Sequence, residues 1–178
     1  MEKVTSKNLL EKIVVNIGTG KLSQLANFND KILPQIIKDL SAITGQHPVN
    51  RPAKKSIAGF KLRQGTIVGL QITLRGQKMV DFFERLITIV LPRVHDFKGL
   101  KNGSVDAHGT LSIGFREQVV FPEISPEESQ HIFPLGVNIV PKNGKKEEIV
   151  AAYKTLGVPF AKGDEVAFKK KKRRSGKK

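Results

Sequence analysis

The sequence predicts an α+β domain, with a mostly antiparallel sheet, helices packed on one face and the other face open to a partner. Two observations predict the architecture. Segments of alternating apolar and polar residues, typical of strands, are interleaved with segments whose apolar residues recur every three or four positions, typical of helices. Each strand-like segment also has one fully apolar face and one face of small or amide side chains, as in a sheet buried on one side only. The sequence contains no internal repeat.

Three segments alternate regularly enough to be assigned as strands. Their apolar faces are Ile13, Val15 and Ile17; Val68, Leu70, Ile72 and Leu74; and Leu135, Val137 and Ile139. Their mixed faces are Val14, Asn16 and Gly18; Ile67, Gly69, Gln71 and Thr73; and Gly136, Asn138 and Val140. Further strands are expected near residues 48–55 and 111–121.

Three segments have the apolar stripe of a helix that packs on a core. The stripes are Phe28, Ile32, Ile36, Leu40 and Ile43; Met79, Phe82, Phe83, Leu86, Ile87 and Val90; and Ile149, Ala152, Tyr153 and Leu156. Gly45 and Gly157 are expected to end the first and third helices as C-terminal caps. Pro92 is expected to end the second, and Pro34 either kinks the first helix or starts it.

The charge of the chain favours a polyanionic partner. Its 178 residues include 31 Lys and Arg against 16 Asp and Glu, a formal net charge of +15. Eight of the basic residues lie in the last ten positions, a run expected to be a solvated, disordered extension in the free protein. Subtracting them leaves +7 on the rest, so the body is basic by itself. Nucleic acid is the first candidate partner and an anionic membrane the second.

Composition excludes several function classes. No stretch approaches the roughly 20 apolar residues of a membrane span, and the first twelve residues lack a signal-peptide core. The absence of cysteine removes disulfides, thiolate nucleophiles and cysteine-bound zinc. We expect no cofactor.

Signals for enzyme chemistry are weak. The pairs His95-Asp96 and Asp106-x-His108 lack a recognised metal spacing, and solvated loop side chains are the simpler interpretation. Residues 18–21, Gly-Thr-Gly-Lys, follow a strand but lack the other glycines and the Lys-Ser/Thr pair of a phosphate loop. A turn that uses glycine's backbone freedom explains them better.

The segment from Arg51 to Gly65 is more informative. It carries five basic residues and one aromatic, Phe60, and no acidic residue lies between Asp39 and Asp81. A freely solvated loop would explain this composition. A cationic loop with an exposed aromatic also suits phosphate contacts combined with packing on a ribose or base, and we favour that interpretation.

Several motifs, in order along the chain, resemble the bacterial large-subunit ribosomal protein five family, the 5S rRNA binders. They are residues 43–48 (ITGQHP), 54–65 (KKSIAGFKLRQG), 68–76, 82–87 (FFERLI), 91–100 (LPRVHDFKGL), 114–118 (GFREQ), 120–124 (VFPEI) and 156–160 (LGVPF). The resemblance covers about residues 11–160. It implies a cytoplasmic, ribosome-bound structural protein and no enzyme activity.

The resemblance also implies partners and site residues. Members bind 5S rRNA, attach it to the large rRNA in the central protuberance, and bridge to a protein of the small-subunit head. The 5S rRNA contacts correspond to Asn16, Gln46 and Thr73. A basic loop that contacts P-site tRNA corresponds to residues 51–64, with Arg51, Lys54, Lys55, Ser56, Phe60, Lys61, Arg63 and Gln64 as the expected contacts. Residues 98–109 and 125–134 are candidates for the bridge to the small subunit.

These expectations divide the chain into a lead-in (1–10), the 5S rRNA-binding α+β domain (11–160) and a basic extension (161–178). The chain departs from the family's usual pattern in two ways, since its first strand begins almost at once and a basic extension follows the last motif. Two other hypotheses stay open on the sequence. One is a generic basic RNA-binding or assembly factor on the same scaffold, and the other is a nucleotide-using enzyme based on the Gly18 turn.

Overall fold

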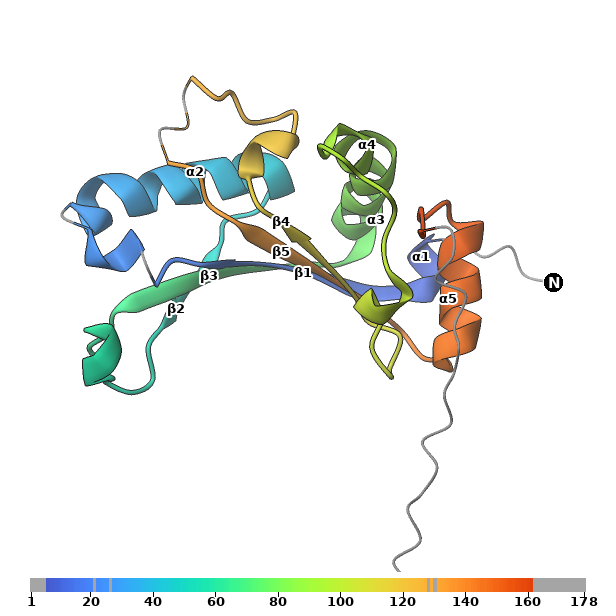
Figure 1. The fold of residues 1–178 in the computed structure, drawn as a ribbon, viewed down its shortest axis with the longest axis horizontal. Helices are drawn as coiled ribbons and strands as arrows, with labels where there is room; N and C mark the ends of the chain where they lie inside the picture. Colours follow the sequence, from blue (N-terminus) through green and yellow to red (C-terminus); the bar gives the residue numbers. More distant parts are fainter. Residues whose placement is uncertain (1–5, 21, 26, 128, 130, 162–178) are drawn as a thin grey trace, which may run out of the picture.

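In the computed structural model, residues 6–20, 22–25, 27–127, 129 and 131–161 are described. Five antiparallel strands form one sheet in the order β2-β3-β1-β5-β4 (Figure 1). The strands are β1 (Leu10–Gly18), β2 (Val49–Pro52), β3 (Ile67–Leu74), β4 (Leu111–Phe115) and β5 (Leu135–Pro141). The predicted fold class is therefore confirmed. The basic extension, apart from its first residue, Ala161, lies outside the described residues.

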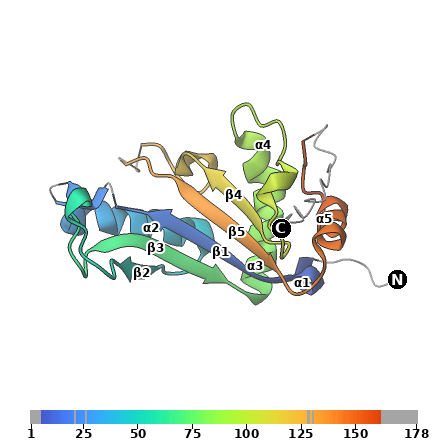
Figure 2. The same cartoon turned by 60° about the horizontal axis from the view of Figure 1, so that its bottom comes forward.

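Helices cover one face of this sheet. They are α2 (Leu33–Thr44), α3 (Gly76–Arg85) and α4 (Leu91–Arg93), which lie above the strands in Figure 1. Figure 2 looks onto the strands from the other side and shows them uncovered over most of their length. The short α1 (Ser6–Leu9) and α5 (Lys146–Thr155) lie together at one end. The core therefore sits between the helix layer and the sheet, and one face of the sheet stays open.

Alternation along the strands decides which side chains enter the core. Ile13, Val15 and Ile17 are buried, whereas Val14 is half-buried and Asn16 exposed. The same alternation holds along β5 and along β3 from Leu70 to Leu74, whereas at the start of β3 Val68 is half-buried and Gly69 is buried. The buried side chains meet the apolar stripes of α2 and α3 in one hydrophobic cluster. Burial of this apolar surface supplies the main driving force for the fold.

Pro34 starts a helix. It occupies the first turn of α2, where its missing N–H is not needed. A single π-helical turn, Phe28–Ile32, leads into it, so the apolar stripe begins before the α-helix does. Gly45 ends the helix in a left-handed conformation, with φ of 65°, as predicted.

The helix expected to end at Pro92 continues one residue further. A π-helical turn, Leu86–Val90, follows α3, and Pro92 then lies in the first turn of α4, which ends at Arg93. The π-helical turn restarts the hydrogen-bond ladder, so the proline N–H is not required there. The strand expected over residues 111–121 is shorter, because β4 stops at Phe115 and Gln118–Val120 form a 3₁₀ turn.

The end of the sheet with α5 is closed by a buried tyrosine. The hydroxyl of Tyr153 donates to the carbonyls of Gly109 and Ile139, at 3.1 and 3.3 Å, and burial raises its pKa. Gly157 follows this helix with φ of 86°, as predicted for its cap. Within the described residues, no helix combines the length and apolarity needed to cross a bilayer.

Candidate nucleic-acid interface

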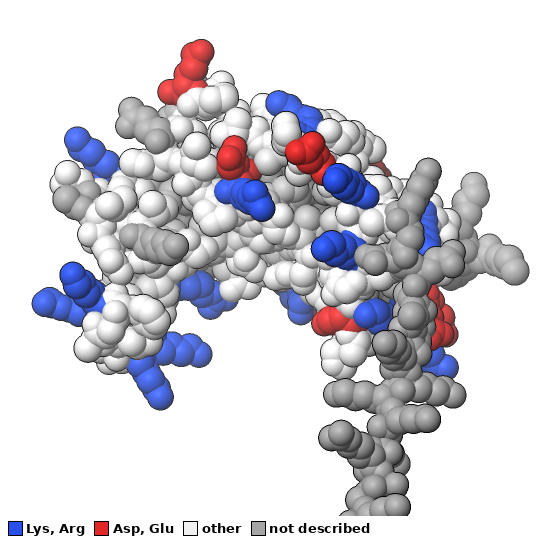
Figure 3. Space-filling view, viewed as in Figure 1, with Lys and Arg blue, Asp and Glu red and all other residues white. Residues whose placement is uncertain are grey.

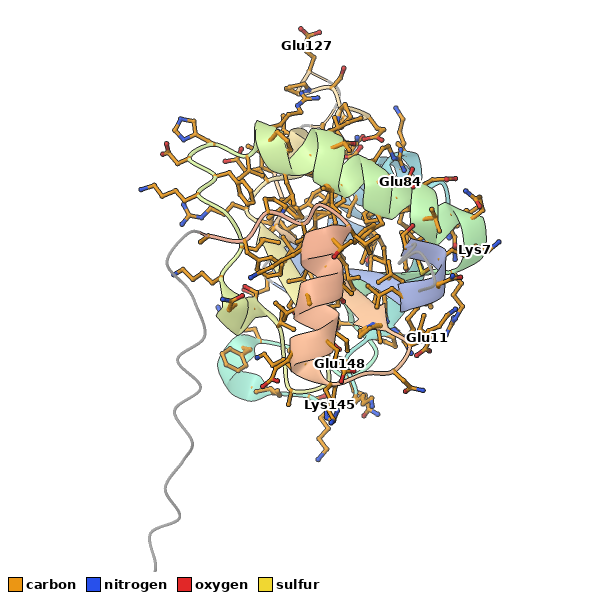
Figure 4. All side chains as sticks on the ribbon, turned by 90° about the vertical axis from the view of Figure 1, so that its right-hand side faces the viewer. Lys7, Glu11, Glu84, Glu127, Lys145 and Glu148 are labelled. Atoms are coloured by element: carbon orange, nitrogen blue, oxygen red, sulfur yellow. The ribbon has the colours of Figure 1, made fainter. Side chains whose placement is uncertain are left out.

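The uncovered side of the sheet carries few charges and many small polar groups. We call it the open face, and it consists of Lys12, Val14, Asn16, Gly18, Val49, Arg51, Gly69, Gln71, Thr73, Ser112, Gly114, Gly136, Asn138 and Val140. In all five strands the only acidic residue is Glu11, which pairs with Lys12 at 3.2 Å. Figure 4 places Glu84 and Glu127 on the helix side of the molecule. Apart from Glu11 at one end of β1, the strands therefore bring no negative charge to the open face that would repel a phosphate backbone.

The strand register places Asn16 at the middle of one row across this face. Asn16 lies opposite Gln71 on β3 and opposite Gly136 on β5, and Gly136 lies opposite Gly114 on β4. The side chain of Asn16 leans over Gly136, because a Cβ built on that glycine would lie 2.5 Å from Asn16 Oδ1. The Asn16 amide therefore packs on the backbone of Gly136, where no side chain intervenes.

Thr73 belongs to the neighbouring row. It lies opposite Val14, which in turn lies opposite Asn138, and Asn138 lies opposite Ser112. Thr73 is a diagonal neighbour of Asn16, a relationship that puts Cβ atoms within about 7–8 Å in antiparallel pairs. The structure thus brings together two of the three residues expected to contact 5S rRNA.

Gln46 is not on a strand. It occupies the turn after Gly45, between α2 and β2, where its side chain is exposed and its carbonyl accepts from the Thr44 hydroxyl at 3.1 Å. The structure therefore places Gln46 apart from the row of Asn16.

Three further polar residues of this face were not among the sequence candidates. Gln71 and Asn138 had been assigned to the mixed strand faces, but only the register shows that they flank Asn16 and Val14. Ser112 extends the second row onto the edge strand. Sequence alternation could have suggested their orientation, but not which strands are neighbours.

The basic loop, residues 53–66, joins β2 to β3 and is a hydrogen-bonded structure in its own right. Ile57 and Leu62 exchange backbone bonds of 2.9 and 3.1 Å, and Ser56 Oγ accepts from the N–H of Gln64 at 2.9 Å. Gln24 donates to the Phe60 carbonyl at 2.9 Å and ties the loop to the segment after β1. A freely solvated loop would not have these bonds.

The side chains of the loop face solvent. The Phe60 ring is 70% exposed, and the four cations of the loop are exposed too: Lys54, Lys55, Lys61 and Arg63. Figure 3 shows Lys and Arg gathered at this end of the molecule, with no acidic side chain beside them in that view. The loop thus presents positive charge and one aromatic ring on an ordered support.

Arg51 was expected among the contacts of this loop, and it also fell within the strand predicted near residues 48–55. It lies in β2, which is Val49–Pro52. It pairs with Gly69 on β3, and its Nε donates to Gln71 Oε1 at 2.8 Å. Its side chain thus lies at the boundary between the open face and the basic loop.

Two family models together cover nearly all of the folded chain. Residues 7–63 match the model described as ribosomal protein L5, and residues 67–160 match the model of the C-terminus of the same family. The chain belongs to the ribosomal protein L5 family. Its members are structural proteins of the large ribosomal subunit, so the chain is a ribosomal protein and not an enzyme.

Curated relatives of this L5 family agree over nearly their whole length. The chain is 42% identical over 167 residues to large ribosomal subunit protein uL5 of Fusobacterium nucleatum, covering 91% of this chain and 89% of that protein. It is 43% identical to the Carboxydothermus hydrogenoformans protein of the same name over 167 residues, 91% of each chain. For the Geobacter sulfurreducens protein the identity is 48% over 151 residues, covering 85% and 82%.

The groups considered for enzyme chemistry have structural explanations in this L5 family member. Asp106 Oδ1 accepts from the N–H groups of His108 and Thr110, both at 2.8 Å, and closes a turn. His95 and Asp96 pair at 3.0 Å with side chains 95% and 80% exposed. Thr19 is buried and donates its N–H to the Val68 carbonyl at 2.9 Å. Among the described residues, no three His, Cys, Asp or Glu side chains cluster as metal ligands would.

Proposed function

We propose that the open face binds 5S rRNA and that the chain holds this RNA against the large rRNA in the central protuberance of the large subunit. The observation that supports this most is the row centred on Asn16, whose amide is held over Gly136 of β5 and lies opposite Gln71 of β3. A strand face is rigid, so it can hold hydrogen-bonding groups in fixed register against a structured RNA. Hydroxyl and amide groups suit the ribose 2′-hydroxyls and base edges that RNA displays.

Glycine and other small residues also favour close approach. Gly18 and Gly114 are exposed and Gly136 is half-buried, and none of the three adds a side chain to the open face, so an RNA strand can lie near the sheet without steric conflict. Three side chains project from this surface and are proposed to make the specific hydrogen bonds to RNA: Asn16, Thr73 and Asn138. Gln46, at the rim between α2 and β2, is proposed as a contact outside the face.

The basic loop is proposed to contact P-site tRNA. Its four exposed cations and Phe60 suit phosphates and a ribose or base face, which are common to all tRNAs. A P-site tRNA changes identity in every elongation cycle, so a contact that does not depend on sequence is appropriate there. Ser56 and Gln64 contribute by closing the loop onto itself.

The bridge to the small-subunit head is proposed for residues 98–109 and 125–134. Glu127, in the second segment, projects at the outer limit of the molecule in Figure 4, far from Lys145 and Glu148 at the start of α5. A contact there would not compete with RNA on the open face.

Binding of 5S rRNA to single alanine variants tests the main proposal. Asn16→Ala and Thr73→Ala should each weaken binding by about 1–3 kcal/mol, because a buried polar group of the RNA loses its partner. Thermal stability should change little, since both side chains point away from the core. Thr88→Ala is the matched control, because its exposed hydroxyl bonds only to the Glu84 carbonyl in the helix layer. Normal affinity in both sheet variants would refute the assignment of the open face.

A further inference from the structure

We propose that Arg51 is a phosphate-binding residue of the open face, where it binds the backbone of the RNA that lies across the strands, and that it does not belong to the tRNA-contacting loop. This inference rests on the proposed function of the open face and adds to it a specific ionic contact. The geometry of Arg51, its hydrogen bond to Gln71 and its remaining N–H donors carry the inference.

Arg51 lies where the regular part of β2 ends. Arg51 pairs with Gly69, and the register of β2 shifts between Arg51 and Pro52. The regular register therefore ends just after Arg51, although Pro52 still pairs with Ile67 before the basic loop begins at residue 53. A Cβ built on Gly69 would lie 3.9 Å from Arg51 Cβ, so Arg51 projects from the same side of the sheet as position 69.

The hydrogen bond to Gln71 fixes the direction of the Arg51 side chain. Arg51 Nε donates to Gln71 Oε1 at 2.8 Å. Gln71 lies directly opposite Asn16 on β1. The guanidinium is therefore held toward the row of Asn16 and not toward the tip of the loop.

Most N–H donors of the Arg51 guanidinium remain available for a ligand. A guanidinium has five N–H donors in a planar fork, and the bond to Gln71 uses one. Within the described part of the chain, Arg51 forms no ion pair, and β2 and β3 contain no acidic residue. The two terminal nitrogens can therefore bind the two free oxygens of one phosphate, a geometry that lysine cannot reproduce.

Within the open face, Arg51 is far from the other cation, Lys12. Lys12 is the other cation of the open face, and it lies six residues along β1 from Gly18, which pairs with Gly69. At about 3.3 Å per residue this separation is about 20 Å. The amide-rich centre thus has one cation near each end, and Arg51 is the cation beside the Asn16 row.

Salt-dependent binding of transcribed 5S rRNA tests the inference. Arg51→Ala should weaken binding roughly 10-fold at moderate salt and reduce the slope of log K against log salt by about 1, since one phosphate contact is lost. Arg51→Lys should restore the slope but only part of the affinity, because charge returns without the fork. Arg63→Ala is the matched control. It removes one exposed cation from the loop and should leave both quantities unchanged.

Phosphate ethylation of the RNA provides a second readout that a merely structural role would not change. One ethylated phosphate should interfere with binding of the wild-type chain and stop interfering with Arg51→Ala. If Arg51→Ala proves unstable, ethylation interference is compared between the wild-type chain and Arg51→Lys. A lysine contacts a phosphate at a single point, so the interference should be weaker with Arg51→Lys.

The outcomes separate the two proposals. Failure of the wild-type chain to prefer 5S rRNA over another RNA of equal length would overturn the proposed function itself. Specific binding by the wild-type chain, combined with equal affinity, slope and interference for Arg51→Ala and Arg63→Ala, would overturn the inference alone. Arg51 would then belong with the basic loop.

Discussion

Asn16 on β1 and Gly136 on β5 are fitted to each other across the open face. A Cβ at position 136 would lie 2.5 Å from Asn16 Oδ1, 3.5 Å from its Cγ and 3.8 Å from its Nδ2. The place of the asparagine amide therefore depends on a missing side chain in the adjacent strand. A residue proposed to bind RNA is thus positioned by one that contributes no functional group.

Gly136→Ala should consequently mimic the loss of Asn16. The new methyl group would force the Asn16 amide to rotate away, and 5S rRNA affinity should fall by about 1–3 kcal/mol. The fold should persist, because the obstructed atom is the end of a solvent-facing side chain. Gly103→Ala is the control, because Gly103 does not belong to the open face and a Cβ there meets no atom within 4 Å. Equal affinities of the two variants in a filter-binding assay would show that the placement of Asn16 does not matter.

Removing the four loop cations together should separate tRNA contact from 5S rRNA binding. Ribosomes carrying Lys54→Ala, Lys55→Ala, Lys61→Ala and Arg63→Ala should retain a full complement of 5S rRNA, since these residues lie off the open face. They should release P-site tRNA faster than wild-type ribosomes, because phosphate contacts have been removed. The measurements are 5S rRNA per particle and the tRNA dissociation rate. Loss of 5S rRNA with normal tRNA retention would reverse the assignment of the two surfaces.

Ser129 joins the segment before β5 to the helix layer through a buried polar network. Its hydroxyl donates to Asp39 Oδ2 at 2.6 Å and accepts from Gln118 Nε2 at 2.8 Å. Ser129→Ala leaves a buried carboxylate oxygen without this donor and should lower the free energy of unfolding by about 1–3 kcal/mol. Urea denaturation measures the change, and exposed Ser125→Ala is the control. Affinity for 5S rRNA should not change, because α2 lies on the opposite side of the sheet.

The turn closed by Asp106 should make a pH-dependent contribution to stability. Slight desolvation acts to raise its pKa, but hydrogen bonds from the Thr110 and His108 N–H groups outweigh it and leave the pKa below its usual value. A lowered folded-state pKa stabilises the fold above the unfolded value of about 3.9, and this contribution disappears as pH falls through the folded value. Asp106→Asn should therefore melt below the wild-type temperature at pH 7. The difference in melting temperature between Asp106→Asn and the wild-type chain should become smaller near pH 3. A difference that stays constant with pH would show that the Asp106 charge does not contribute to stability.

Much of the fold could be predicted from periodicity because it depends on which residues are buried. Ile13, Val15 and Ile17 share a strand face in any sheet, so β1, β3 and β5 and the orientation of Asn16 and Thr73 followed from alternation alone. Gly45 and Gly157 fell where helices end, because few other residues adopt a left-handed backbone without cost. The helix end predicted at Pro92 was wrong by one residue, because the π-helical turn before Pro92 removes the need for a proline N–H.

The fold class, the basic charge, the family resemblance and the polar character of one sheet face could all be predicted from the sequence, because they are local or compositional properties. The strand order came from the tertiary structure, and with it that Gln71 and Gly136 flank Asn16 and that Arg51 reaches Gln71. The physical reason is that alternation specifies the face of a residue but not its neighbour in the next strand. That neighbour depends on how β1, β3 and β5, more than 40 residues apart in sequence, pair around one shared core.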